Sequence, residues 1–353
     1  MRRHLLPVLT LFLLAPVIGE LVSGSSPPAN WLQPGNYLFM VPLYGAGALL
    51  VRELAVRWKT GWAGVILLGA AYGILEEGID VMSFFNTAWP DLGASALYGR
   101  WADVSWIWTV HLTCYHAAFS IAVPILLTHL IFPKSRGESW LGCFGTAVTA
   151  AVLAADVLIG NLLFRQVYDY VPPVLPYCGS MLVIALLVFA AGRVRAPRPL
   201  TGAEQKPLPP PWLYGAAGFA STTVFFLAAW VPPNTGVPPL LAVLLILLPA
   251  AAVLVILERS YRHGSRFTDS RKLALVFGGL FFLALLTLVT ESRGVDPGTG
   301  ESMAGMACVG LLTVLALAAL TIIVRRRERR PGESAQVEGP PTSRDNPRGI
   351  FDT

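Results

Sequence analysis

The chain has 353 residues, of which 54% are hydrophobic and only 13% are charged. Soluble domains typically contain about 25% charged residues, so this composition excludes an ordinary soluble globular protein. The formal net charge of +5 does not indicate a nucleic-acid partner, because most of the basic residues lie in short loops and in the C-terminal tail. We therefore expect an all-α polytopic membrane protein.

Ten apolar segments reach the length of about 17 to 25 residues that a membrane-spanning helix needs. In chain order they cover residues 5–23, 36–57, 61–83, 104–132, 141–163, 174–192, 212–231, 237–257, 272–292 and 304–324. The first segment also has the basic start and the apolar core of a signal peptide, and the sequence leaves open whether it is cleaved.

The basic residues predict the orientation. With the N-terminus in the cytoplasm, the cytoplasmic segments hold 22 of the 26 lysines and arginines, whereas the opposite side holds only Arg100, Arg165 and Arg293. This asymmetry places both termini in the cytoplasm by the positive-inside rule. The excess of arginine over lysine is typical of GC-rich bacterial genomes, so we expect a multi-pass protein of the plasma (inner) membrane of a bacterium.

The spans are interrupted by one segment rich in proline and charge. Residues 193–211 are predicted to be a cytoplasmic linker between a six-helix bundle, residues 1–192, and a four-helix bundle, residues 212–324. The polar tail, residues 325–353, is predicted to be disordered and cytoplasmic.

Polar side chains gather in the outer half of the first five spans. The third span ends in "AYGILEEGID", residues 71–80, which brings two adjacent glutamates and an aspartate to membrane depth. Ionisable groups at this depth are costly and usually functional. The later spans contain no comparable set, so the first bundle is predicted to carry the chemistry. The set consists of Glu20, Glu76, Glu77, Asp80, His111, His116, Asp156 and Asn161.

Helix geometry indicates which of these residues share a face. Gly69 and Gly73 form a GxxxG pair, which lets another helix approach closely. Glu77 lies four residues after Gly73 on the same face and should point into the bundle. His111 and His116 are about 140° apart around their helix, so both cannot face one point squarely. The predicted site is therefore centred on Glu77 and His116.

The predicted roles fall into two groups. The candidate catalytic residues are Glu76, Glu77, His111, His116 and Asp156, and the supporting residues are Glu20, Asp80 and Asn161. Asp80 is also expected to be solvated at the outer interface, and Asn161 to form a hydrogen bond between helices. No metal site is predicted, because the spacing HxxxxH differs from the i, i+4 pair of the HExxH motif.

A glutamate pair that ends one membrane helix, with histidines on a later helix, resembles the CPBP family of intramembrane glutamic proteases, which includes the CAAX prenyl endopeptidases. The likeness covers about residues 61–165 and implies water activation for amide hydrolysis within the membrane. The arginine of that family's EExxxR motif is replaced here by Val81, and its FxxxH motif is matched loosely by Leu112 to His116 or by Ile107 to His111. Asp156 and Asn161 stand in for a later HxxxN or HxxxD motif, because no histidine is present there.

Three functions remain open at this point. In an intramembrane hydrolase, Glu77, assisted by Glu76, would be the general base that activates water, and the histidines would stabilise the oxyanion or position the water. In a proton- or cation-coupled transporter, Glu77, Asp156 and His116 would form a relay. The third is a non-catalytic membrane scaffold. The expected partners are the lipid bilayer and a membrane peptide, a lipid or a small solute; the sequence does not specify the substrate, a cofactor or the oligomeric state.

Overall fold

The computed structural model describes residues 2–196 and 207–329, and this part of the chain is almost entirely helical. Nine of its helices are long and apolar enough to cross a membrane, which confirms the all-α polytopic membrane fold. They are α3 (Pro34–Trp58), α4 (Gly61–Ile74) continued by η3 (Leu75–Asp80), α5 (Trp106–Tyr115) continued by η5 (His116–Ala122) and α6 (Val123–Ile131), α7 (Cys143–Val167), α8 (Val174–Arg193), α9 (Pro211–Trp230), α10 (Pro239–Tyr261), α11 (Asp269–Arg293) and α12 (Met306–Arg329).

The first predicted span is helical but shorter than the other nine. It consists of α1 (Leu5–Pro16) and η2 (Val17–Leu21), and it packs against α3. The remaining elements are short connections: η1 (Arg2–His4), α2 (Pro28–Trp31), η4 (Pro90–Ala96), η6 (Pro133–Ser135), η8 (Pro232–Asn234), η9 (Gly264–Arg266) and an antiparallel pair of strands, β1 (Arg100–Trp101) and β2 (Val104–Ser105).

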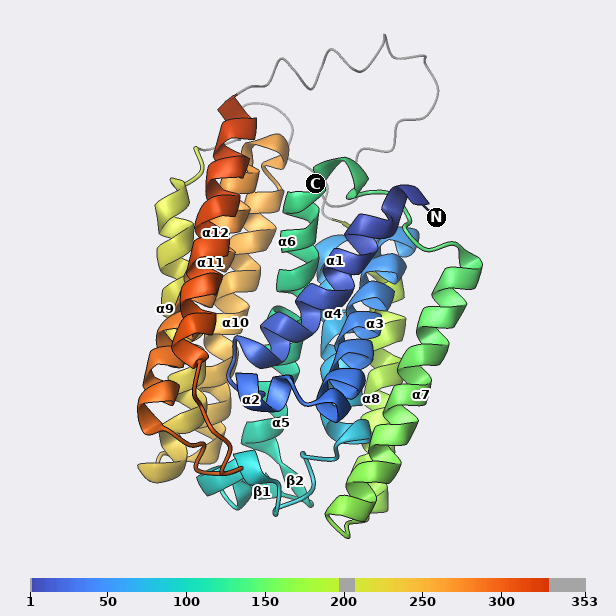
Figure 1. Cartoon of the computed structure of the whole chain (residues 1–353), viewed down its shortest axis with the longest axis vertical. Coiled ribbons are helices and arrows are strands. Elements are labelled where there is room, and N and C mark those ends of the chain that lie inside the picture. Colours follow the sequence, from blue (N-terminus) through green and yellow to red (C-terminus); the bar gives the residue numbers. More distant parts are fainter. Residues whose placement is uncertain (1, 197–206, 330–353) are drawn as a thin grey trace.

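The helices pack in two groups on either side of one long helix. α9, α10, α11 and α12 lie on one side, whereas α1, α3, α4, α7 and α8 lie on the other (Figure 1). The continuous helix α5–η5–α6 runs between them and contacts both α4 and the helices α9 to α11. Residues 197–206 of the predicted linker and 330–353 of the predicted tail lie outside the described residues, and α12 extends to Arg329, past the predicted end of the last span.

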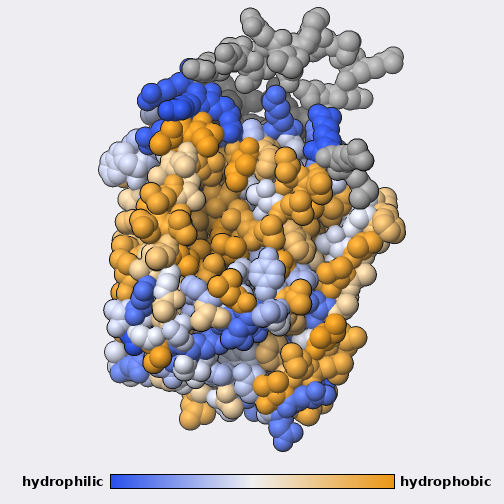
Figure 2. Space-filling view, in the orientation of Figure 1, coloured by the Kyte–Doolittle hydropathy of each residue, from blue (hydrophilic) through white to orange (hydrophobic). Residues whose placement is uncertain are grey.

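The outer surface of the helices suits a lipid environment. α7 and α8 bury little of their surface against the rest of the molecule, and most of their large apolar side chains are exposed. Hydrophobic side chains dominate the middle of the face in Figure 2, and hydrophilic side chains gather at the end where α12 terminates. An exposed apolar band between two polar ends is the pattern of a protein that crosses a bilayer.

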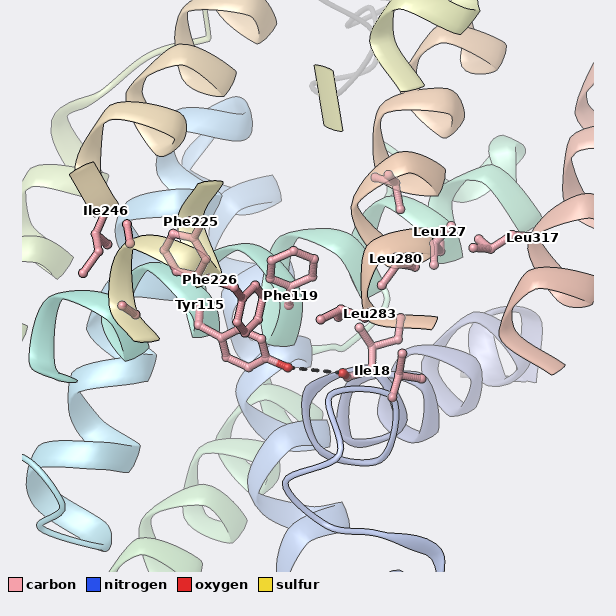
Figure 3. Close-up of a cluster of buried hydrophobic side chains, with 14 of the residues drawn as sticks. Ile18, Tyr115, Phe119, Leu127, Phe225, Phe226, Ile246, Leu280, Leu283 and Leu317 are labelled. Carbon is pink, nitrogen blue, oxygen red and sulfur yellow. Dashed lines mark hydrogen bonds between the residues drawn. The ribbon is translucent and has the colours of Figure 1, made fainter. Parts of the chain in front are cut away.

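A buried apolar cluster joins the two groups. Tyr115, Phe119 and Leu127 of the central helix meet Phe225 and Phe226 of α9, together with leucines of α11 and α12 (Figure 3). The Tyr115 hydroxyl also reaches across to the first helix, where it donates a hydrogen bond of 2.7 Å to the carbonyl oxygen of Gly19. The central helix is therefore held on both sides, which fixes the position of His116 immediately after Tyr115.

Candidate functional site

Three short π-helical segments carry the polar residues of the membrane interior. In η2, η3 and η5 the backbone hydrogen bond spans five residues instead of four, as from Val22 N to Val17 O and from Val81 N to Glu76 O, both 2.9 Å. Glu20 lies in η2, both glutamates of the pair and Asp80 lie in η3, and His116 begins η5. π-helical turns are rare and are frequent at functional sites.

Proline accounts for the position of one of these segments. Pro124 follows η5 by two residues, so the carbonyl four residues before it, that of Ser120, lies inside η5. Proline donates no backbone hydrogen bond and its ring crowds the carbonyl four residues earlier, so the backbone around it departs from regular α-helix.

The structure brings Glu76, Glu77 and His116 together, and we call these three residues the Glu–His centre. The Nε2 atom of His116 lies 3.1 Å from Oε1 of Glu77, and its Nδ1 atom lies 3.2 Å from Oε2 of Glu76. The three side chains are between 2% and 12% exposed. A single imidazole is therefore placed between two carboxylates inside the membrane-spanning part of the molecule.

Further polar groups orient the centre. Ser83 donates a short hydrogen bond to Oε2 of Glu77, and the Ser83 oxygen accepts a hydrogen bond of 3.0 Å from Nε1 of Trp108. The hydroxyl of Ser120, one turn after the histidine, lies 3.0 Å from Nδ1 of His116, as expected for residues on one helix face. These contacts fix the rotamers of both partners of the Glu77–His116 pair.

Close backbone packing explains how the two helices place these groups. A Cβ atom at Gly73 would lie only 2.8 Å from Cβ of His116, and one at Gly69 would lie 3.0 Å from Cα of Ala117. The close approach predicted from the GxxxG pair is therefore confirmed, and its partner is η5. The rings of Tyr44 and Tyr72 enclose the histidine, with centroids 6.0 and 6.2 Å from the imidazole.

Glu20 lies beside the centre but has partners of its own. Its carboxylate accepts a short hydrogen bond from Tyr44 and one of 2.9 Å from the hydroxyl of Ser26. Because the Tyr44 ring also contacts His116, Glu20 is one side chain away from the centre. Its supporting role remains a prediction.

Asp80 corrects one prediction. It was expected to be solvated, yet it is fully buried, and neither carboxylate oxygen has a hydrogen-bond partner in the part of the chain that the structure describes. It is enclosed because η3 packs directly on α7, where the Asp80 carboxylate lies against Gly160. Asp156 lies one turn before Gly160 and is partly buried, so α7 brings it towards Asp80. Within the described ranges, the ion pairs of His116 are with Glu76 and Glu77 and not with Asp156.

Asn161 forms a hydrogen bond between helices, as predicted. Its Nδ2 atom donates to the carbonyl oxygen of Ile79, at 2.6 Å, and to the hydroxyl of Tyr177, at 3.2 Å. It thereby ties α7 and α8 to η3, next to the glutamate pair.

His111 lies apart from the Glu–His centre. Its ring stacks on Phe225 with centroids 4.5 Å apart, and its Nδ1 atom is enclosed without a hydrogen-bond partner among the described residues. It lines a pocket of about 150 Å³ between α5 and α9, together with Trp108, Trp230, Asp91 and other residues of η4 and η8. Trp108 belongs both to the wall of this pocket and to the hydrogen-bond chain that reaches Glu77 through Ser83.

Several residues of the site were not predicted from the sequence. Ser83, Tyr44 and Tyr72 contact predicted residues, and Trp108 donates a hydrogen bond to Ser83. Their types are common at membrane interfaces and in helix contacts, so only the fold distinguishes them.

Comparisons with known proteins agree with this architecture. The chain has no match among curated proteins or among solved structures. A family model described as an uncharacterized membrane protein family matches residues 9–237, a segment that contains the whole Glu–His centre and its supporting residues. Because this match covers more than half of the sequence, the chain belongs to that membrane protein family.

Proposed function

We propose that the protein is an intramembrane hydrolase in which the Glu–His centre holds and activates a water molecule. The observation that carries this proposal is the 3.1 Å contact between Oε1 of Glu77 and Nε2 of His116 within the membrane-spanning helices. A carboxylate in contact with an imidazole provides two groups that exchange protons, and such pairs act as general acid and base in hydrolysis.

The carboxylates and the imidazole of the centre can carry every proton that the hydrolysis moves. A carboxylate of the pair accepts one proton of the water while the water oxygen bonds to the carbonyl carbon of an amide or ester. As the bond from that carbon to the leaving nitrogen or oxygen breaks, the proton passes through His116 to the leaving group. The products are a carboxylic acid and an amine or alcohol, and no oxidant or reductant is consumed.

The resemblance to the CPBP family supports this function. Glu76 and Glu77 correspond to the glutamate pair of that family, and its FxxxH motif is matched loosely by Leu112 to His116 or by Ile107 to His111. Val81 replaces the family's arginine, and the later histidine is replaced by Asp156 and Asn161, of which Asn161 bonds to backbone beside the glutamates. Stabilisation of the oxyanion would therefore depend on other donors here, and Ser83 and Ser120 each place a hydroxyl group at the centre.

The pocket lined by Trp108 and His111 is our candidate for the substrate site, because a hydrogen-bond chain from Trp108 through Ser83 connects it to Glu77. Its wall combines the apolar side chains of Ile107 and Trp230 with the polar groups of Asp91, His111 and Asn234. Such a lining suits an amide or ester group carried on an apolar body, as in a membrane peptide or a lipid. We infer that the reaction takes place in the outer half of the plasma membrane.

Labelled water tests this proposal without knowledge of the substrate. Membranes containing the full-length protein are incubated in H₂¹⁸O, and the peptide and lipid fractions are analysed by mass spectrometry. Hydrolysis leaves one ¹⁸O atom in the acid product. We expect labelled products with the wild type and a loss of at least about 100-fold with Glu77→Gln, because general-base catalysis contributes about 10²–10⁴-fold.

The matched control is Glu258→Gln. This exposed glutamate pairs with Arg262 at the end of α10 and makes the same change of charge far from the centre. Equal labelling in membranes that contain the wild type, Glu77→Gln and no protein at all would refute the hydrolase proposal. Labelling abolished by both substitutions would refute the assignment to the centre.

A further inference from the structure

The Glu–His centre has the composition of a metal site as well as that of an acid–base pair. Glu76, Glu77 and His116 each offer one donor atom, and these three atoms lie within 4.8 Å of one another. The donors come from two helices, so the spacing of histidines along one helix, which argued against a metal, does not apply to this arrangement.

The separation of the first two donors matches that of ligands to one ion. Two ligands bound at about 2.0–2.2 Å in neighbouring positions around a metal lie about 3.0–3.4 Å apart. Nε2 of His116 and Oε1 of Glu77 are 3.1 Å apart, so an ion fits between them with small movements of the side chains. Glu76 contacts the other ring nitrogen, Nδ1, at 3.2 Å, so its carboxylate has to turn towards Nε2 to become the third ligand.

Charge balance favours a divalent cation. Two ionised carboxylates that are almost entirely buried carry two negative charges, and uncompensated charge in such surroundings is costly. A divalent ion with a neutral imidazole brings the sum of charges to zero. In the described residues, no lysine or arginine forms an ion pair with Glu76 or Glu77.

Hydrogen bonds from neighbouring side chains orient the donor residues, as is usual for metal ligands. Ser83 fixes the second oxygen of Glu77, and Ser120 lies at the ring nitrogen of His116 that faces away from Glu77. Hydrogen bonds of this kind orient ligands and contribute about 10- to 100-fold to metal affinity. Carboxylate and imidazole together suit ions such as Zn²⁺ and Mn²⁺.

We propose that Glu76, Glu77 and His116 bind one divalent first-row metal ion, Zn²⁺ or Mn²⁺. The site itself rests on geometry and charge. Its use rests on the proposed function, in which the ion would polarise the water that the centre activates.

The metal content of the purified full-length protein tests the site. The protein in detergent is treated with a chelator, incubated with Zn²⁺ or Mn²⁺ alone, desalted and analysed by elemental mass spectrometry. We expect about one ion per chain for the wild type and at least a tenfold lower content for His116→Gln and Glu77→Gln, because each loses a ligand.

Two variants serve as controls. His111→Gln removes a buried histidine of the same helix, and Asp80→Asn removes a buried carboxylate of the same π-helical segment, but neither residue belongs to the centre. Both should keep about one ion per chain. Gel filtration and the unfolding temperature are measured for every variant, and a ligand variant that aggregates is replaced by Glu76→Gln.

The outcomes separate this inference from the proposed function. Retention of neither ion by the wild type, or equal losses in His111→Gln and His116→Gln, would overturn the metal site. If the wild type retains no ion but Glu77→Gln still abolishes ¹⁸O incorporation, the hydrolase stands without a metal. If the ion is retained and no labelled product forms, the metal site stands and the hydrolase is refuted.

Discussion

The Asp80 carboxyl group is buried at a cost in stability. It is fully buried, and neither oxygen has a hydrogen-bond partner among the described residues. Burial of an unsatisfied polar group costs about 1–3 kcal/mol. Among the described residues no contact offsets this cost. Asp80 lies four residues after Glu76 in η3, and α7 brings Asp156 towards it.

The first prediction concerns this residue. Asp80→Asn removes the charge and keeps the shape, so we expect the unfolding temperature in detergent to stay constant or to rise by a few degrees, which corresponds to about 1 kcal/mol. The measurement is thermal unfolding followed by the fluorescence of the tryptophans. A fall of the unfolding temperature by a few degrees or more would show that Asp80 has a partner that stabilises the native state.

A second residue-scale prediction concerns the contacts that orient Glu77. Ser83→Ala removes the hydroxyl that donates to Glu77 and accepts from Trp108. Loss of a hydrogen bond that orients a functional group typically costs about 10- to 100-fold in function. We therefore expect the yield of ¹⁸O-labelled product to fall by about tenfold with little change in stability. Ser292→Ala, which removes an exposed hydroxyl at the end of α11, is the control and should leave the yield unchanged.

At the scale of elements, the contact between α4 and η5 determines whether the centre forms. The third prediction concerns Gly73, where a Cβ atom would lie 2.8 Å from Cβ of His116. Gly73→Ala should separate the two helices and destabilise the protein by about 1–3 kcal/mol, as overpacking of a filled interior does. Gly179→Ala in α8 is the matched control, because nothing lies within 4 Å of a Cβ atom there, and it should be neutral or slightly stabilising.

The unfolding temperatures of both glycine variants are measured with the metal content of each. Equal unfolding temperatures for the two variants would contradict the close packing of α4 on η5. A Gly73→Ala protein that is less stable but retains the ion would show that the centre tolerates the shift.

The same elements show what could be predicted from the sequence. Apolar length and the positions of loops predicted all nine long helices, and glycine spacing on α4 predicted the close contact that carries Glu77 towards His116. The π-helical segments could not be predicted, because they arise from proline and from packing between distant helices. For the same reason, the solvated position expected for Asp80 was wrong: its depth was estimated along one helix, whereas its burial comes from α7.

At the scale of the whole molecule, two ends differ in how they are built. At the end that carries the helix termini of α6, α11 and α12, Arg136 forms an ion pair with Asp269, and Glu328 accepts a hydrogen bond of 2.8 Å from the backbone of Ser270. At the other end lie the strands β1 and β2 (Figure 1), and residues of η4 and η8 line the pocket that contains His111. We therefore expect the substrate of the proposed hydrolase to arrive from the side of the membrane that this second end faces.

The last prediction tests which side of the membrane this second end of the molecule faces. The positive-inside rule places Lys134, after α6, in the cytoplasm and Thr87, before η4, outside. Both side chains are exposed. In a background whose four cysteines are replaced by alanine, a membrane-impermeant maleimide should label Thr87→Cys in intact cells, and should label Lys134→Cys only after the cells are permeabilised. The reverse pattern would place the pocket and the Glu–His centre towards the cytoplasm, where the substrate would have to be a molecule of the inner leaflet, and it would overturn the predicted orientation while leaving the geometry of the centre unchanged.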